Sequence, residues 1–451
     1  MVYAKLPQVG RCAGLASPSP RFHPFKVTQL VKIVGWTVLW GVPALVSAEE
    51  ERPFLFSPVT EIPEWRLLES HQGTITRAQF EDRWKRIYDP AGVLAKYIRV
   101  TDEGVELFRD TAKTQSLFYL RFASGEGREE RGLSVVSWSP EKPLLGKVIC
   151  LDPGHIGGDW ADVEERTFRI GRDRPVVEGE LNLKTCRLLA KRLQDAGAQV
   201  VWTHQGFEPT TRLRPDDLYP EAIQYMLQDV KSRRFPSYSA NGLIRWNAEL
   251  LFYRTAEIQA RARKVNEELR PDLTLCLHYN AAPWGRAGRA SLATANRVVL
   301  FAHGAYTADE LAYDDQKFHL FQKLLENSTP EELEIGAAVG KEFKEKWGVP
   351  AEDCGNSGYA HATGASPYLW FRNLIANRLF HGPVIFVEGP YMNDRTSYSW
   401  IQAGEYEGTI LIGGRMRENI FREYADRVAD GVIGVFREWQ KRSPAFTNYS
   451  P

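Results

Sequence analysis

The chain has 451 residues and a formal net charge of zero, with 57 basic and 57 acidic side chains. Its apolar fraction of 43% and charged fraction of 25% are close to those of average globular proteins, which excludes a wholly disordered, collagen-like or coiled-coil chain. The balanced charge gives no reason to expect a nucleic-acid-binding protein, because such proteins usually carry a basic excess. A chain of this length is expected to form two or three domains.

Residues 1–48 have the pattern of a secretory signal peptide. They contain five basic and no acidic side chains, so residues 49–451 carry 52 basic against 57 acidic ones, a net charge of −5. The uncharged run Ile33–Val46 follows Lys32, and small residues end the segment at Ala48. This run of 14 residues is short for a membrane-spanning helix, although an uncleaved anchor is the alternative. We expect an exported protein of the periplasm or cell envelope, with no stable membrane span after cleavage.

The first part of the remaining chain, residues 49–143, has a composition of its own. Alternating polar and apolar residues predict a helix and two strands there, followed by a linker. These elements are Thr76–Ile87, Val105–Arg109, Ser116–Ala123 and the linker Ser137–Pro143. We interpret the region as a small α+β accessory domain, and no motif assigns it a role.

From Gly146 onward, short apolar runs alternate with helical patterns. The expected strands are Val148–Leu151, Gln199–Thr203, Leu273–Leu277, Val298–Ala302 and Pro383–Val387, and the expected helices are Leu181–Ala196, Thr255–Leu269, Glu331–Lys346 and Met416–Trp439. This alternation predicts an α/β fold with a mostly parallel sheet flanked by helices. Two stretches, near 206–250 and 304–365, are too long for ordinary connections and are expected to hold loops around the site. Residues 442–451 form a tail.

The mature chain keeps four cysteines, at positions 150, 186, 276 and 354. Three of them lie in apolar runs, which favours buried free thiols over a disulfide framework. No Cys-x-x-Cys pair occurs, so a cysteine-based zinc site is not expected.

Four polar residues lie where an apolar strand ends or a helix begins. His155 and His278 follow the first and third strands, Glu178 precedes a helix, and Glu388 ends the last strand. Ligands of open parallel sheets bind beyond the carboxyl ends of the strands, so these side chains are expected to converge. Two histidines and a glutamate can hold catalytic zinc and leave a fourth position for water. A further carboxylate can then transfer the proton of that water.

The segments around these residues resemble the zinc-dependent N-acetylmuramoyl-L-alanine amidases of the Amidase_3 type. The matching runs, in family order, are LDPGH (151–155), EGELNL (178–183), LCLHYNA (275–281) and VIFVEG (384–389), within residues 146–441. The resemblance implies Zn²⁺ ligation by His155, Glu178 and His278, with Glu388 as the catalytic carboxylate. It also implies hydrolysis of the amide between N-acetylmuramic acid and L-alanine in bacterial peptidoglycan. The sequence departs from the family at Ile156, where glycine usually follows the histidine.

Several residues near these motifs have two interpretations. Glu180 competes with Glu178 for the ligand position, although the motif offset favours Glu178. Asp152 either orients a ligand histidine or fixes its own loop by backbone hydrogen bonds. Asn280, two residues after His278, is a further candidate for orienting a ligand or contacting substrate. Arg372 either holds a carboxylate of the stem peptide or forms a structural salt bridge.

Other functions are compatible with the same residues. A carboxypeptidase or an amidohydrolase of soluble muropeptides would use a similar zinc site, and a non-catalytic wall-binding regulator is a weaker alternative because all four site residues are present. The expected partner is peptidoglycan or a muropeptide, and any protein activator is unknown. Residues 304–365 are a hypothetical autoinhibitory element.

Overall fold

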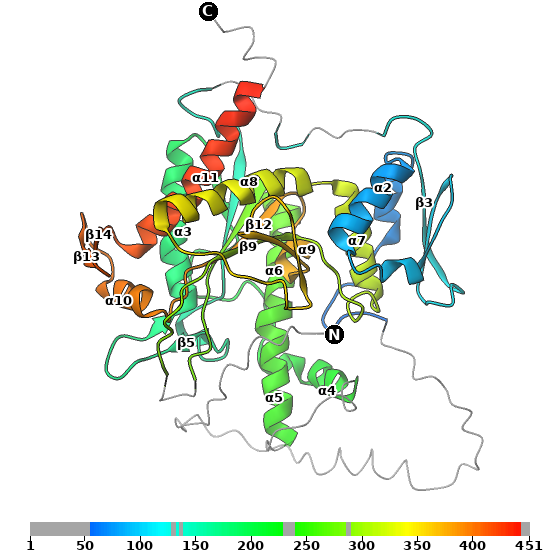
Figure 1. The fold of residues 1–451 in the computed structure, drawn as a ribbon. Helices are drawn as coiled ribbons and strands as arrows, with labels where there is room; N and C mark the ends of the chain where they lie inside the picture. Colours follow the sequence, from blue (N-terminus) through cyan, green and yellow to red (C-terminus); the bar gives the residue numbers. More distant parts are fainter. Residues whose placement is uncertain (1–54, 128–131, 135–138, 229–239, 286–289, 443–451) are drawn as a thin grey trace, which may run out of the picture.

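The structure is a computed structural model that describes residues 55–127, 132–134, 139–228, 240–285 and 290–442. The predicted signal peptide, all of the tail beyond Arg442 and the start of the predicted linker lie outside these residues. Within them, a central sheet carries helices on both faces, and a smaller strand-rich region lies to one side (Figure 1).

The central sheet has seven strands in the order β10-β11-β9-β12-β8-β4-β7. Their bounds are β4 Val148–Pro153, β7 Gln199–Trp202, β8 Leu273–Tyr279, β9 Val299–His303, β10 Ala360–Ala362, β11 Leu369–Arg372 and β12 Val384–Gly389. Strands β12, β8, β4 and β7 are parallel neighbours, as the alternating pattern predicts. Strands β9 and β11 are parallel to each other but run opposite to the rest, because β9 pairs antiparallel with β12. The predicted α/β class is confirmed as a mixed sheet.

Helices cover each face because strand side chains alternate between two hydrophobic clusters. Leu151 and Leu275 face the larger cluster under α3 (Glu178–Asp195), α8 (Thr329–Glu342) and α11 (Ile420–Arg442). Cys150, Cys276 and Phe386 face the opposite cluster. That cluster is covered by α6 (Glu257–Arg263), by the helical turn η7 (Lys264–Leu269) and by α9 (Ile375–Leu379).

The region before the sheet forms a three-stranded antiparallel sheet and short helices. Its strands are β1 Ile98–Val100, β2 Gly104–Phe108 and β3 Ser116–Arg121, and its helical segments are η1 Trp65–His71, α2 Arg77–Arg83, η2 Trp84–Tyr88 and η3 Leu94–Lys96. The expected helix and two strands are therefore present, and β1 is an additional strand. Thr76 caps α2 through a capping box with Gln79, which fixes where the helix begins.

The region packs against α7 (Asp314–Glu326) through aromatic rings. The ring of Phe321 lies 5.8 Å from that of Phe80 and 6.4 Å from that of Phe118, measured between centroids. Residues of the two regions thus belong to one continuous hydrophobic cluster.

The first long stretch contains helices where only loops were expected, and the second contains α7 in addition to the expected helix Glu331–Lys346, which corrects part of the expectation. The first holds η5 Pro215–Leu218, α4 Tyr219–Gln228 and α5 Ala240–Leu251, which is followed by η6 Phe252–Ala256 before α6, and the second holds α7, α8 and η8 Phe343–Trp347. Helices form there because their apolar faces are buried: Phe318, Phe321 and Leu324 of α7 all belong to the main core.

The last helix begins later than the sequence pattern predicts. Met416 lies in β14 (Arg415–Arg417), which pairs with β13 (Ile410–Ile412) in a hairpin, and α11 starts at Ile420. Gly413 and Gly414 between the two strands both have positive φ, which reverses the chain at this point. The remaining elements are η4 Gly158–Trp160, β5 Thr167–Phe168, β6 Val176–Val177 and α10 Arg395–Ala403.

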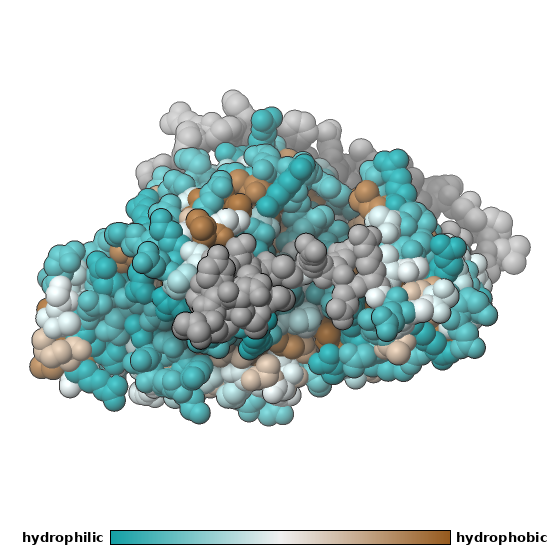
Figure 2. All heavy atoms as spheres, turned by 90° about the horizontal axis from the view of Figure 1, so that it is seen from above, coloured by the Kyte–Doolittle hydropathy of each residue, from teal (hydrophilic) through white to brown (hydrophobic). Residues whose placement is uncertain are grey.

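The surface seen from above in Figure 2 is mainly hydrophilic, with apolar residues in small separate groups. In the part of the chain that the structure describes, no helix has the length and apolarity needed to cross a membrane. Cys150, Cys186, Cys276 and Cys354 are free and buried, as predicted.

Candidate metal centre

Three residues from distant segments converge at one edge of the central sheet. His155 lies in the loop after β4, Glu178 is the first residue of α3, and His278 lies near the end of β8. One ligand atom from each of them lies within 4.8 Å of the others. Glu180, the competing carboxylate, is not part of this group, and Glu178 is fully buried in it.

The spacing of these atoms fits a tetrahedral metal ion. The Oε1 atom of Glu178 lies 3.3 Å from His155 Nε2 and 3.1 Å from His278 Nδ1. Ligand atoms at about 2.0–2.1 Å from a tetrahedral zinc ion are about 3.3 Å apart. Two imidazole nitrogens and one carboxylate oxygen are also a donor set that zinc accepts in catalytic sites. The residues present therefore fit the ion that the sequence motifs imply.

The charges around His155 favour a cation at this position. Burial by itself would lower the pKa of His155, but the carboxylates of Glu178 and Glu164 raise it to about 9. Burial would raise the pKa of Glu178, whereas the imidazoles of His155 and His278 hold it well below its usual range. A positive charge between these groups is thus favoured, whether it is carried by protons or by a metal ion.

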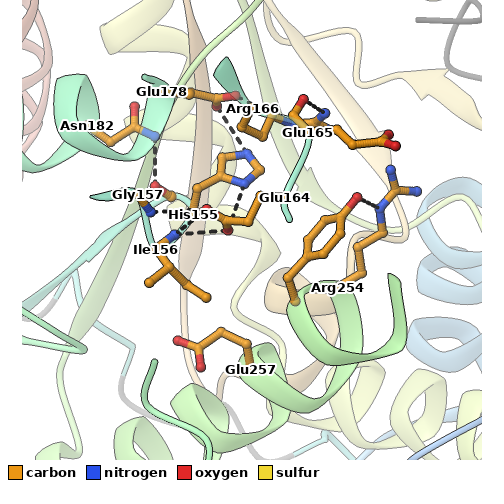
Figure 3. A network of polar contacts seen from close by, with 12 residues as sticks. His155, Ile156, Gly157, Glu164, Glu165, Arg166, Glu178, Asn182, Arg254 and Glu257 are labelled. Carbon is orange, nitrogen blue, oxygen red and sulfur yellow. Dashed lines mark hydrogen bonds and ion pairs between the residues drawn. The ribbon is translucent and has the colours of Figure 1, made fainter. Parts of the chain in front are cut away.

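A second carboxylate orients His155 from the opposite side of its ring (Figure 3). The Oε1 atom of Glu164 lies 3.3 Å from His155 Nδ1, so with a metal bound Nδ1 would keep the ring proton and Nε2 would face the ion. Glu164 also accepts the backbone N–H groups of Ile156 and Gly157. None of the sequence motifs pointed to Glu164. The only signal for it was an acidic side chain nine residues after the histidine, in a stretch that departs from the family pattern.

The loop that carries His155 is held in a left-handed conformation. His155 has φ of 63°, which a non-glycine residue adopts only when its surroundings enforce it. Arg261 supplies part of that restraint, because its guanidinium donates to the backbone carbonyls of Pro153 and His155. Asp152 accepts from Arg261 and from Thr203, and among the described residues it makes no hydrogen bond to an imidazole. These contacts favour the interpretation that Asp152 fixes the loop.

His278 is fixed by packing rather than by a second carboxylate. Its ring stacks on Phe386 with centroids 4.4 Å apart and planes 19° apart. On the ring's other side lies Gly154, where a Cβ atom would approach His278 to 2.2 Å. Asn182 donates to the carbonyl of Gly154, which explains why an asparagine follows Glu178 by four positions in this motif. The glycine is therefore required by close contact and not by its own φ.

Glu388 lies beside the three ligand candidates. It pairs in register with His278 across the parallel strands β12 and β8, and both side chains line one cavity of about 360 Å³. Burial raises the pKa of Glu388. Arg166 lines the same cavity, with its Nε atom 3.5 Å from the second oxygen of Glu178. Asn280 also lines the cavity, while its side-chain oxygen accepts the N–H of Ala281.

Ile156, which replaces the usual glycine, connects the site to the helices of the first long stretch. Its side chain is buried in a separate cluster with residues of η5, α4 and α5, among them Leu218, Ala222 and Leu251. The residue next to His155 thus packs against helices that continue into η6, where Tyr253 and Arg254 line the cavity.

Comparison with known proteins identifies the family. The family model described as N-acetylmuramoyl-L-alanine amidase (Amidase_3) matches residues 149–413. No curated protein was found to match the chain. Solved structures with similarity include the amidase Ami1 from Mycobacterium smegmatis, with 14% identity, coverage of 65% of this chain and 99% of that chain, and a TM-score of 0.35. The catalytic domain of the amidase CwlV from Bacillus (Paenibacillus) polymyxa has 13% identity, coverage of 66% and 99%, and a TM-score of 0.34.

The family match spans more than half of the 451 residues and contains all four of the residues around the candidate centre. The chain belongs to the N-acetylmuramoyl-L-alanine amidase family, whose members hydrolyse an amide bond of bacterial peptidoglycan.

Proposed function

We propose that this amidase cleaves the bond between N-acetylmuramic acid and L-alanine with a zinc ion held by His155, Glu178 and His278. The observation that carries the proposal is the convergence of one carboxylate oxygen and two imidazole nitrogens, at 3.1 and 3.3 Å, from three separate segments. Glu388 supports it because this carboxylate lines the same cavity without belonging to the group of ligand atoms.

Bound zinc would lower the pKa of a water molecule toward 7 and polarise the scissile carbonyl. In our proposal Glu388 accepts the proton of the attacking water and delivers it to the departing nitrogen of L-alanine. The amide C–N bond breaks, the carbonyl carbon gains the hydroxyl group, and the nitrogen gains the proton. A base whose pKa is raised by burial suits this exchange, because proton transfer in both directions is easiest when that pKa approaches the working pH.

Glu164 and Arg261 have supporting roles in the same proposal. Glu164 keeps Nε2 of His155 directed at the ion, and Arg261 holds the loop on which His155 lies. Arg166 restrains the second oxygen of Glu178. None of these three side chains is required to bind the metal directly.

We further propose that the protein acts outside the cytoplasmic membrane. The signal-peptide pattern of residues 1–48 supports this, and peptidoglycan, the substrate of the family, lies there. The boundary predicted between residues 143 and 146 stays a prediction. Autoinhibition by residues 304–365 also stays a hypothesis. Deleting the whole segment would not test it, because α7 and α8 contribute to the main core.

The decisive experiment is mass spectrometry of purified sacculi digested with the mature protein, with and without a chelator. We expect new free amino groups on L-alanine, loss of products with chelator, and recovery on adding zinc. Release of a carboxy-terminal amino acid instead would identify a carboxypeptidase. Glu388→Gln should bind zinc normally and lose about 10²–10⁴-fold in turnover, whereas His155→Ala should lose the metal.

A further inference from the structure

A row of side chains crosses the sheet from the metal centre to the far end of the cavity. It starts at His278 on β8 and continues through Phe386 on β12 and Phe301 on β9 to Arg372 on β11. Successive separations are 4.4 Å and 6.5 Å between ring centroids, then 5.3 Å from the Phe301 centroid to the guanidinium carbon. His278, Phe386 and Arg372 line one cavity, so this row leads from its metal end to a cationic end, while Phe301 belongs to the buried core.

The guanidinium of Arg372 contacts aromatic rings and not the carboxylate that a structural salt bridge would require. Its guanidinium lies 4.3 Å from the ring of Tyr359 as well as over Phe301. Within the described ranges no carboxylate forms an ion pair with Arg372, although Glu388 and Glu310 are close enough to influence its pKa. Contacts with ring faces leave the N–H edges of a guanidinium available to a ligand. The structural salt bridge considered for Arg372 is therefore absent from the described residues.

A second buried arginine lies at the same end of the cavity. Arg378 is 6% exposed, and its Nη1 atom donates to Asn373. The Nε atom of Arg378 is buried and has no hydrogen-bond partner among the described residues. Among the described residues no carboxylate forms an ion pair with this buried guanidinium, so an anionic group at this end of the cavity is favoured.

The acidic side chains nearby are engaged elsewhere. Asp315 accepts the N–H of Ser57, and Glu310 accepts the N–H and hydroxyl of Thr307. Neither carboxylate forms an ion pair with Arg372 or Arg378 in the part of the chain that the structure describes. This end of the cavity therefore presents guanidinium donors that the chain's own carboxylates do not satisfy.

We propose that Arg372, with Arg378 behind it, binds a carboxylate of the stem peptide while the scissile amide lies at the metal centre. The inference rests on the proposed function, because it takes the amide end of the cavity as given. A guanidinium fork matches a carboxylate through two parallel hydrogen bonds. One peptide residue spans about 3.3–3.6 Å, so the row from His278 to Arg372 corresponds to a few residues of an extended stem peptide.

Matched substrates test the proposal. N-acetylmuramoyl-L-alanyl-D-glutamate is compared with the same compound bearing an amide in place of its free α-carboxylate, and a tripeptide acid is compared with its terminal amide. We expect the zinc-loaded enzyme to prefer one acid over its amide in kcat/KM. Arg372→Met should lower kcat/KM for that acid roughly 10- to 100-fold and abolish the preference. Arg372→Lys should retain part of it, because the charge remains but the planar fork is lost.

Control variants and a binding measurement separate the possible failures. Arg437→Met removes an exposed arginine on α11 and should leave every rate unchanged. Zinc content and thermal unfolding show whether Arg372→Met still folds. Calorimetry with the peptide products of both substrate pairs, each as the acid and as the amide, measures the carboxylate site without catalysis.

Each result bears on only one of the two proposals. Equal losses for acid and amide in Arg372→Met, or equal affinity of wild type for the acid and amide products, would overturn the carboxylate site. Failure of the wild type to cleave any substrate, with the binding preference intact, would instead refute the proposed function. The pair of substrates that shows the preference identifies which carboxylate is bound.

Discussion

Replacing Gly154 with alanine should weaken zinc binding strongly while the metal-free protein still folds. The new Cβ atom would lie 2.2 Å from Cε1 and 2.4 Å from Nδ1 of His278, whereas ordinary van der Waals contact begins at 3.4 Å. The imidazole or the loop must therefore move by about 1.2 Å to restore that contact. Metal–ligand distances tolerate only about 0.2 Å, so a shift of this size removes His278 from the coordination sphere.

Neither side of this contact can move at low cost. The ring of His278 is backed by Phe386 at 4.4 Å, and Gly154 is held by hydrogen bonds to Leu277 and from Asn182. We expect zinc affinity to fall at least 10- to 100-fold, together with a loss of about 1–3 kcal/mol in the unfolding free energy of the metal-free protein.

The assay is zinc titration against a chromophoric chelator, with denaturant unfolding of the metal-free protein alongside. Gly206→Ala is the matched control, because no atom lies within 4 Å of the added Cβ and the φ of Gly206 is not positive. Native zinc affinity and native hydrolysis in the Gly154→Ala variant would refute the reasoning. If the metal-free variant does not fold, the clash with His278 disrupts the fold and not the metal site alone.

Two further variants test other parts of the structure. Glu164→Gln should weaken zinc binding about 10- to 100-fold with the fold retained, because His155 loses its orienting carboxylate; unchanged affinity in the same titration would contradict that role. Burial raises the pKa of Glu332 to about 7 from 4.5, so between these pH values the folded protein retains a proton that the unfolded chain releases. The unfolding free energy should then fall by about 3 kcal/mol as pH rises through this window, and denaturant titrations of Glu332→Gln at pH 4.5 and pH 8 should lack that decrease.

Many of the local elements and the identities of the candidate ligands follow from the sequence alone. Apolar runs such as Leu273–Leu277 are buried on both faces, so they mark central strands without any knowledge of their neighbours. The order of the motifs then indicated the four candidate site residues, because each lies at the end of an expected strand or the start of an expected helix. These residues are His155, Glu178, His278 and Glu388. The residue types and their positions in the chain were therefore sufficient to identify them as candidates.

The tertiary structure decided what surrounds those residues. The reversed direction of β9 and β11 depends on pairing between distant strands, which no local pattern encodes. Glu164 reaches His155 only because the loop after β4 folds back upon itself, and Gly154 is required only because His278 packs against it. Arg372 lies at the far end of the cavity through contacts across four strands. Such relations arise from packing between segments far apart in the chain, so the sequence can name these residues but cannot place them.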